Sequence, residues 1–328
     1  MKLATRRSGH VDGRLVVVSR DFSAVADAGG IALTLQEAVE NWEKAKPELD
    51  RLYRDLNEGK VANAEPYDLR MLTAPLPRAW QWLDASAFPS HGELMQKAFN
   101  LPPIATTPPL MYQGMSHRFL GPTDDVPLPS ETGGMDFEGE FGIITGLVPM
   151  GTASADAPGY ICLAVQINDW SLRAYAAAEM KTGFGWIHAK PACSVAPVAV
   201  TLDELGDYWE SSRITARLRV DVNGKMFGDV PATEMQFGFH ELIEHAARTR
   251  ELCAGTVIGS GTVSSRQFRE TGSCCIAERR AIEMIDHGAP RTEFLRFKDR
   301  VRMSTKLGAE MHSPFGVMDQ QVVSWTCG

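Results

Sequence analysis

The 328-residue sequence predicts a mainly β fold with some α-helix, in the α+β class. Its 29 Gly and 19 Pro favour a turn-rich chain. Strand-like runs at 160–168, 214–223 and 300–304 are separated by Gly, Pro and Asn, whereas clear helical patterns are few, such as the one around residues 240–249. A chain of this length buries enough apolar surface to fold without a disulfide or a structural metal.

The first 75 residues are interpreted as a small N-terminal domain. Short strands are expected around the apolar run 15–18, and Thr34-Leu-Gln-Glu37 has the pattern of a capping box that opens a helix. We expect this helix to end near Pro47.

A second helix in this domain is indicated by an apolar face at helical spacing, formed by Leu49, Leu52, Tyr53 and Leu56. The two prolines of Ala74-Pro-Leu-Pro-Arg78 then favour an extended linker. We therefore place a domain boundary at residue 75, with the larger domain at 76–328.

Charge and composition favour a small-molecule partner. The formal net charge is -8 and no long Lys/Arg run is present, which argues against nucleic-acid binding. The apolar run near the N-terminus has four residues, too short for a signal segment or a membrane span, so we expect a cytoplasmic protein without a membrane partner. The six cysteines form no C-x-x-C pair and are interpreted as reduced core thiols.

The strongest local signal is a set of alternating carboxylates. In a strand over Asp136-Phe-Glu138-Gly-Glu140-Phe-Gly-Ile143, the three acidic side chains share one face and the apolar ones share the other. Like charges this close are stabilised by a cation, and oxygen ligands suit Mg²⁺, Mn²⁺ or Ca²⁺. The alternative is an ordinary solvated strand face.

A third carboxylate follows the next apolar strand. Residues 160–167 are nearly continuously apolar and lead directly into Asn168-Asp169-Trp170-Ser171-Leu172-Arg173. Sites are commonly built where strands end, so Asp169 becomes a further metal-ligand candidate. Arg173 either orients a ligand or forms a structural ion pair.

These motifs, together with Ala189-Lys190-Pro191 and Gly259-Ser-Gly261-Thr262, resemble the fumarylacetoacetate hydrolase family in order and approximate spacing over residues 80–328. The resemblance implies a mixed β-sandwich roll as the catalytic domain, a small N-terminal domain and a homodimer. It also implies a divalent cation, Mg²⁺ in the first place with Mn²⁺ or Ca²⁺ as alternatives, held by Glu138, Glu140 and Asp169.

The resemblance extends to a fourth ligand and a general base. The family pattern has an earlier aspartate and a histidine seven residues later, which match Asp84 and His91. Glu278 is the nearest candidate for the carboxylate that orients this histidine. Glu93 is a second candidate, although Ser90-His-Gly-Glu93 also has the pattern of a capping box.

Substrate contacts are implied less completely. Lys190 matches a family lysine that contacts substrate oxygens, and Thr262 follows a glycine turn suited to substrate contact. The family's other substrate-binding positions fall on Ser86, Asn100 and Ala176, which lack the expected side chains. Loop residues at 112–118, namely Tyr112, Gln113 and Arg118, are candidates to replace them.

The function implied is metal-dependent hydrolysis of a carbon–carbon bond in a diketo acid, a β-diketone or acylpyruvate such as fumarylacetoacetate, in aromatic-compound catabolism. His91 would activate water, and a Lewis-acidic ion with Lys190 would stabilise the departing enolate. Two alternatives stay open. One is decarboxylation of oxaloacetate-like acids or enol/keto isomerisation on the same metal site, and the other is a non-catalytic metal-binding protein.

Overall fold

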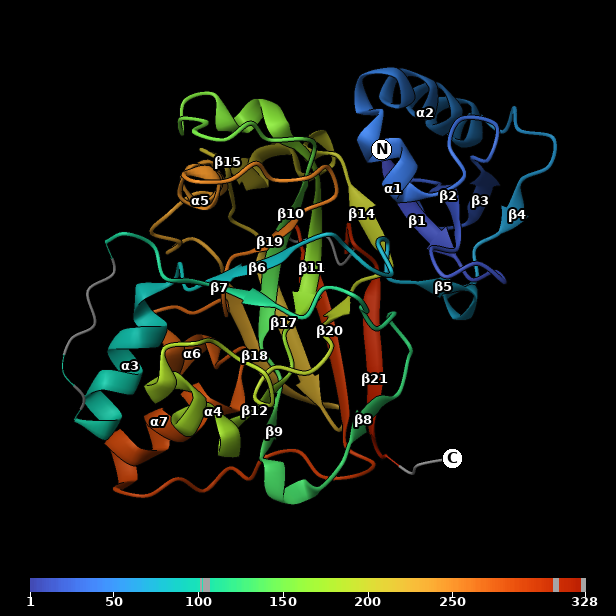
Figure 1. Ribbon diagram of the computed structural model, residues 1–328. Helices are drawn as coiled ribbons and strands as arrows, with labels where there is room; N and C mark the ends of the chain where they lie inside the picture. The colour runs from blue at the N-terminus through green and yellow to red at the C-terminus, as the bar shows by residue number, and fades with distance from the viewer. Residues whose placement is uncertain (101, 103–106, 309–312, 326–328) are drawn as a thin grey trace.

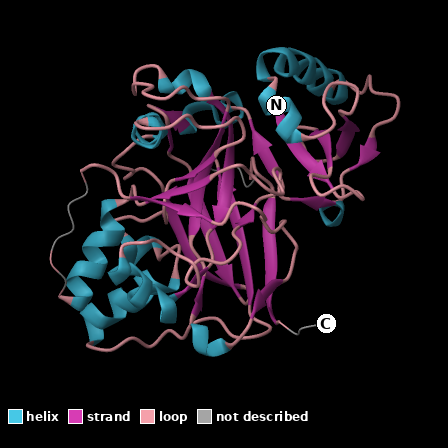
Figure 2. Cartoon of the chain, in the orientation of Figure 1, coloured by secondary structure: helices cyan, strands magenta, loops and turns pink. Residues whose placement is uncertain are grey.

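Two β-sheets packed face to face form the centre of the molecule, and the helices lie around their periphery (Figures 1 and 2). The computed structural model describes all residues except 101, 103–106, 309–312 and 326–328. The α+β prediction is confirmed.

The larger sheet has twelve strands in the described chain, ten of them in the order β4-β3-β2-β1-β14-β11-β10-β19-β6-β7, with β5 beside β1 and β13 beside β11. Its strands are β1 (Lys2–Arg6), β2 (Arg14–Val18), β3 (Ala24–Asp27), β4 (Glu65–Pro66), β5 (Leu72–Thr73), β6 (Trp82–Ala85), β7 (Met111–Gly114), β10 (Gly139–Thr145), β11 (Ile161–Asn168), β13 (Ser194–Val195), β14 (Val198–Val200) and β19 (Val257–Gly259).

The second sheet has five strands in the order β18-β17-β20-β21-β8. They are β8 (Val126–Leu128), β17 (Arg217–Val222), β18 (Lys225–Pro231), β20 (Arg300–Lys306) and β21 (Val317–Ser324). Two short pairs complete the β-structure: β9 (Met135–Asp136) with β12 (Ser171–Leu172), and β15 (Trp209–Glu210) with β16 (Arg213–Ile214).

Seven α-helices are described: α1 (Leu35–Glu40), α2 (Trp42–Asn57), α3 (Pro89–Phe99), α4 (Arg173–Thr182), α5 (Phe239–Ala247), α6 (Phe268–Thr271) and α7 (Ile276–His287). The first two pack with the N-terminal strands, and α3, α4, α6 and α7 lie together beside the two sheets (Figure 1). No helix among the described residues has both the length and the apolar character that crossing a bilayer requires.

The N-terminal helices differ from the sequence prediction at Pro47. The Thr34 hydroxyl accepts from the Glu37 amide, as a capping box requires, but the first helix ends at Glu40 and Pro47 lies inside α2. The apolar face of α2, including Leu49 and Tyr53, is buried, and this burial outweighs the one backbone hydrogen bond that proline removes.

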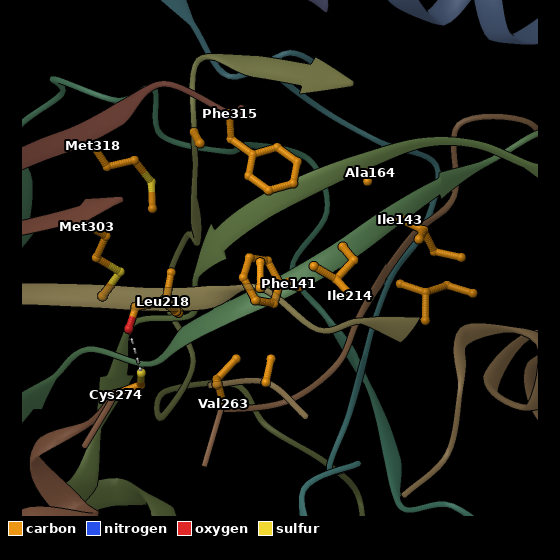
Figure 3. Close-up of a cluster of buried hydrophobic side chains, with 14 of the residues drawn as sticks. Phe141, Ile143, Ala164, Ile214, Leu218, Val263, Cys274, Met303, Phe315 and Met318 are labelled. Atoms are coloured by element: carbon orange, nitrogen blue, oxygen red, sulfur yellow. Dashed lines mark hydrogen bonds between the residues drawn. The ribbon is translucent and has the colours of Figure 1, made fainter. Parts of the chain in front are cut away.

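The main core fills the space between the two sheets. Phe141 and Ile143 from β10 lie in one apolar cluster with Leu218 of β17 (Figure 3), as the alternating pattern predicted. Gly139 allows the sheets to approach, because a Cβ there would lie 2.7 Å from a Leu218 methyl carbon and 3.4 Å from the Cys274 Cβ. The glycine between the two glutamates is therefore a packing requirement.

Candidate active site

Three buried carboxylates converge in the part of the large sheet that runs from β11 to β6. Asp84 lies on β6, Glu140 on β10, and Asp169 directly after β11. One ligand oxygen from each lies within 4.8 Å of the others, and the three residues are at most 3 % exposed. A Cβ at Gly259 of β19 would lie 2.4 Å from an Asp84 carboxylate oxygen, so this glycine keeps the space between the carboxylates open.

The electrostatics of this cluster fit a cation. Both carboxylate oxygens of Glu140 are buried without a hydrogen-bond partner in the described part of the chain. Burial, reinforced by the Asp169 charge, raises the pKa of Asp84 to about 8, and burial with neighbouring carboxylates also raises the pKa of Glu140. Buried oxygen ligands of this kind suit a hard divalent ion, whose charge would relieve the repulsion.

Glu138 lies at the edge of this cluster, where its carboxylate is held by two cations. It accepts from the Arg173 guanidinium at 2.6 Å and from the Lys190 ammonium. Burial alone would raise the pKa of Glu138, but Lys190 and Arg173 hold it well below its usual range. Glu138 is not among the three residues whose ligand oxygens converge, although the sequence grouped it with them.

Asp169 is the most heavily contacted of the ligand candidates. Its Oδ2 accepts from Lys190 and, at 2.6 Å, from the Tyr112 hydroxyl. Its Oδ1 accepts from the Cys193 thiol at 2.8 Å. The sequence predicted Lys190 and Tyr112 as site residues but interpreted Cys193 as a core thiol, because the six cysteines form no C-x-x-C pair.

The other cysteines also vary in environment. Cys162, Cys274 and Cys275 are buried free thiols, as expected, whereas Cys253 is exposed, which contradicts the interpretation of all six as core residues. Cys327 lies outside the described residues.

The first carboxylate of the alternating set does not belong to the cluster. Asp136 accepts from the amides of Ile276 and Ala277 at the start of α7, and from Arg173. The strand is interrupted after Asp136, so β9 and β10 are separate elements. The solvated-face alternative is wrong, since Asp136, Glu138 and Glu140 are all buried. Arg173 forms ion pairs with both Asp136 and Glu138.

His91 pairs with Glu278. The His91 Nδ1 lies 2.9 Å from a Glu278 carboxylate oxygen, joining α3 to the first turn of α7. Burial alone would lower the pKa of His91, but the Glu278 carboxylate reverses this and the net shift is upward. The Cys275 sulfur lies within 4.8 Å of this pair, and Cys275 pairs with Glu138 across a β-bridge, which connects the pair to the carboxylate cluster.

Glu93 does not contact His91. Its exposed carboxylate binds Arg266, and the predicted Ser90 capping box is also absent because α3 begins one residue earlier, at Pro89. Ser90 instead donates to the Ser264 hydroxyl. Proline suits the first helical turn, which explains why the helix begins there.

Two further candidates have different environments. Gln113 is exposed beside Tyr112 on β7 and accepts from Arg250 at 3.2 Å, so strand alternation directs it away from Asp169. Thr262 is buried directly after Gly261, whose amide donates to Asp84 at 3.2 Å. The glycine turn therefore contacts the carboxylate cluster through its backbone.

Comparisons with known proteins assign both parts of the chain. Residues 81–323 match the family model "Fumarylacetoacetate (FAA) hydrolase C-terminal", and residues 1–78 match "Fumarylacetoacetase N-terminal domain 2".

The relatives carry different activities. The oxaloacetate tautomerase Fahd2a of Rattus norvegicus is 26% identical over 157 residues, covering 47% of this chain and 48% of that protein. The 2,4-didehydro-3-deoxy-L-rhamnonate hydrolase of Sphingomonas sp. is 28% identical over 166 residues, covering 50% and 55%. The chain therefore aligns with about half the length of these curated relatives.

A solved structure matches the whole fold. Maleylpyruvate hydrolase from Sphingobium sp. SYK-6, determined with manganese(II) and pyruvate, superposes with a TM-score of 0.67 at 18% identity, covering 99% of this chain and 100% of that one. At this identity the match establishes the fold.

Proposed function

We propose that this chain, which belongs to the fumarylacetoacetate hydrolase family, is a divalent-metal-dependent hydrolase of a β-diketone or acylpyruvate such as fumarylacetoacetate. The observation that carries the proposal is the His91–Glu278 pair beside the carboxylate cluster. Hydrolysis requires a base that activates water, and a paired histidine adjoining a candidate metal site meets this requirement.

The proposed ion is Mg²⁺, with Mn²⁺ or Ca²⁺ as alternatives. Asp84, Glu140 and Asp169 would hold it, with Glu138 as a further ligand. When bound, the ion would supply Lewis acidity toward the two oxygens of a 1,3-dicarbonyl unit. The manganese(II) in the maleylpyruvate hydrolase structure supports a divalent cation in this fold.

The chain's own residues would carry the proton transfers. With Nδ1–H donated to Glu278, the His91 Nε2 is the free base that takes a proton from water. The resulting hydroxide adds to the acyl carbonyl, the carbon–carbon bond breaks, and the departing carbon is protonated, giving two carboxylic fragments for an acylpyruvate. Lys190 would place positive charge near the carbonyl oxygens, and Tyr112, Arg173 and Thr262 would surround the substrate.

The second candidate is enol/keto isomerisation or decarboxylation of an oxaloacetate-like acid. The alignment with an oxaloacetate tautomerase favours the isomerisation. Such a reaction would need the same carboxylate cluster but no added water. A role in aromatic-compound catabolism, a cytoplasmic location and a homodimer complete the proposal. A protein that binds metal without turnover is the remaining alternative.

The test is turnover of an acylpyruvate panel, including fumarylacetoacetate, and of oxaloacetate, with Mg²⁺, Mn²⁺ or EDTA. We expect metal-dependent loss of the diketo absorbance with two fragments recovered. His91→Ala should lower kcat by about 10²-fold or more, whereas His287→Ala, the same change at an exposed position on α7, should not. Turnover of oxaloacetate alone that persists in His91→Ala would replace hydrolysis by the second candidate, and metal binding with no turnover would reject both.

A further inference from the structure

The loop between α4 and Lys190 is held by one carboxylate. Near the end of α4, Glu179 accepts hydrogen bonds from three successive backbone amides, those of Ile187, His188 and Ala189, at 3.1, 2.7 and 3.1 Å. It also contacts the His188 ring at 2.9 Å. These hydrogen bonds lower the pKa of Glu179 to about 2, so the carboxylate is charged throughout the neutral range.

Two of the large apolar side chains of this loop are not packed against the rest of the protein. The Phe184 and Ile187 side chains are 98 % and 79 % exposed. Residues 183–189 form neither helix nor strand, so their amides depend on side-chain or solvent acceptors. A charged carboxylate is a stronger acceptor than a neutral group, and here it fixes three residues together.

The last residue of the loop is fixed on both sides of its backbone. Its amide donates to Glu179, and the Ala189 carbonyl accepts from the Leu172 amide at 2.8 Å, at the end of the segment that carries Asp169. The Ala189 side chain is buried. Lys190 follows directly, and its ammonium donates to both Glu138 and Asp169.

The same loop contacts the site at a second point. The Trp186 ring packs edge-on against the Tyr112 ring, with centroids 6.2 Å apart. The Tyr112 hydroxyl in turn donates to Asp169. The loop thus supports two of the three side chains that contact the Asp169 carboxylate.

From these contacts we propose that Glu179 is a positioning residue that holds loop 183–189 in the shape that places Lys190 between Glu138 and Asp169. It acts through Lys190 and does not itself touch substrate. The consequence for turnover rests on the proposed function, whereas the positioning of Lys190 does not.

The positioning is tested without an activity assay. In Glu179→Ala, hydrogen exchange of the 187–189 amides should accelerate by about tenfold or more. The exchange rate in Glu179→Gln should lie between those of Glu179→Ala and the parent protein. Reaction of the Lys190 amine with acetic anhydride, followed by mass spectrometry, should rise several-fold. Glu283→Ala is the matched control, because Glu283 likewise accepts from two loop amides, at Arg291 and Thr292. Glu283→Ala should change neither the exchange of the 187–189 amides nor the labelling of Lys190.

Turnover gives a second test through a double-mutant cycle. Glu179→Ala should lower kcat/KM by about tenfold, and the double variant with Lys190→Ala should be no slower than Lys190→Ala alone. Unchanged exchange at 187–189, unchanged Lys190 labelling or multiplicative effects on kcat/KM would each overturn the proposal. If the parent protein turns over no substrate, the proposed function fails, and exchange and labelling still decide the role of Glu179.

Discussion

Glu140 illustrates how a single side chain at the site opposes folding in the absence of a cation. It is fully buried, both its oxygens are without a partner in the described chain, and Asp84 and Asp169 lie beside it. Burying such a carboxylate is unfavourable unless it is neutralised by a proton or by an ion. The binding of a cation should therefore be measurable as a gain in stability.

We predict that Mn²⁺ or Mg²⁺ raises the melting temperature of the protein and that Glu140→Gln abolishes this response. At a cation concentration one hundred times the dissociation constant the gain is about 2.7 kcal/mol. The variant without metal should be at least as stable as the parent, because the mutual repulsion is removed. Differential scanning fluorimetry with added cation or with EDTA measures both. A retained cation response in Glu140→Gln would exclude Glu140 as a ligand.

The carboxylates could be predicted from the sequence because strand alternation and strand ends are local features, whereas the thiol donor could not. Strand β13 pairs antiparallel with β11, and Ser194 lies opposite Asn168. This register places Cys193, the residue before Ser194, opposite Asp169, the residue after Asn168. That register is set by pairing between distant segments, and a single sequence does not specify it.

Among the elements, helix α7 determines where Glu278 lies, and its start is anchored from two directions. Asp136 accepts from its first two amides, and the segment before it packs against β18. Gly228 of β18 pairs with Gly272, and a Cβ at Gly228 would lie 2.2 Å from the Ser273 carbonyl oxygen and 2.8 Å from two further backbone atoms of that residue. Because the contacted atoms belong to the backbone, no flexible side chain can move to make room for a methyl group at position 228.

We predict that Gly228→Ala lowers the free energy of unfolding by about 3 kcal/mol, the upper part of the range for overpacking. Gly159→Ala is the control, because nothing lies within 4 Å of a Cβ at Gly159. Urea unfolding followed by circular dichroism gives both values. Equal stability of the two variants would show that the strand can shift without disturbing the start of α7.

The positions of helix ends were less predictable than the existence of the helices. Ser90 and Glu93 have the residue pattern of a capping box, yet Pro89 begins α3 and the two side chains bind Ser264 and Arg266. The side chains of a capping box can form hydrogen bonds with other groups that the fold brings near them. Here those groups lie more than 170 residues away in the sequence. Local pattern therefore identifies the segment, and tertiary contacts decide its boundary.

In the whole molecule, the N-terminal strands continue the sheet of the larger C-terminal part. Strand β1 pairs with β14, so residues 1–78 and 81–323 share one twelve-stranded sheet. The sequence could not predict this pairing, because β1 and its partner strand are about 200 residues apart and leave no local signal. Charged side chains reinforce this junction, where the Lys2 ammonium binds the Glu204 carboxylate at 2.8 Å.

We predict that Glu204→Gln lowers the free energy of unfolding by about 2 kcal/mol at pH 7, because it leaves the Lys2 ammonium buried without its counter-charge. Burial alone would raise the pKa of Glu204, but Lys2 overcomes it and the net pKa is about 2, below the ordinary 4.5. A carboxyl group whose pKa is lower in the folded state stabilises the fold at pH values above its ordinary pKa. This contribution is lost as the pH falls toward 2.

The difference between parent and Glu204→Gln should therefore be full at pH 7, shrink below about pH 4.5 and disappear near pH 2. Asp50→Asn, which breaks a half-exposed ion pair with Lys46, is the control and should change stability by less than about 0.5 kcal/mol at any pH. Urea titrations at pH 7, 4 and 3 measure the trend. A difference that stays constant with pH would mean that Glu204 joins the two regions through its shape and hydrogen bonds and that its charge contributes nothing.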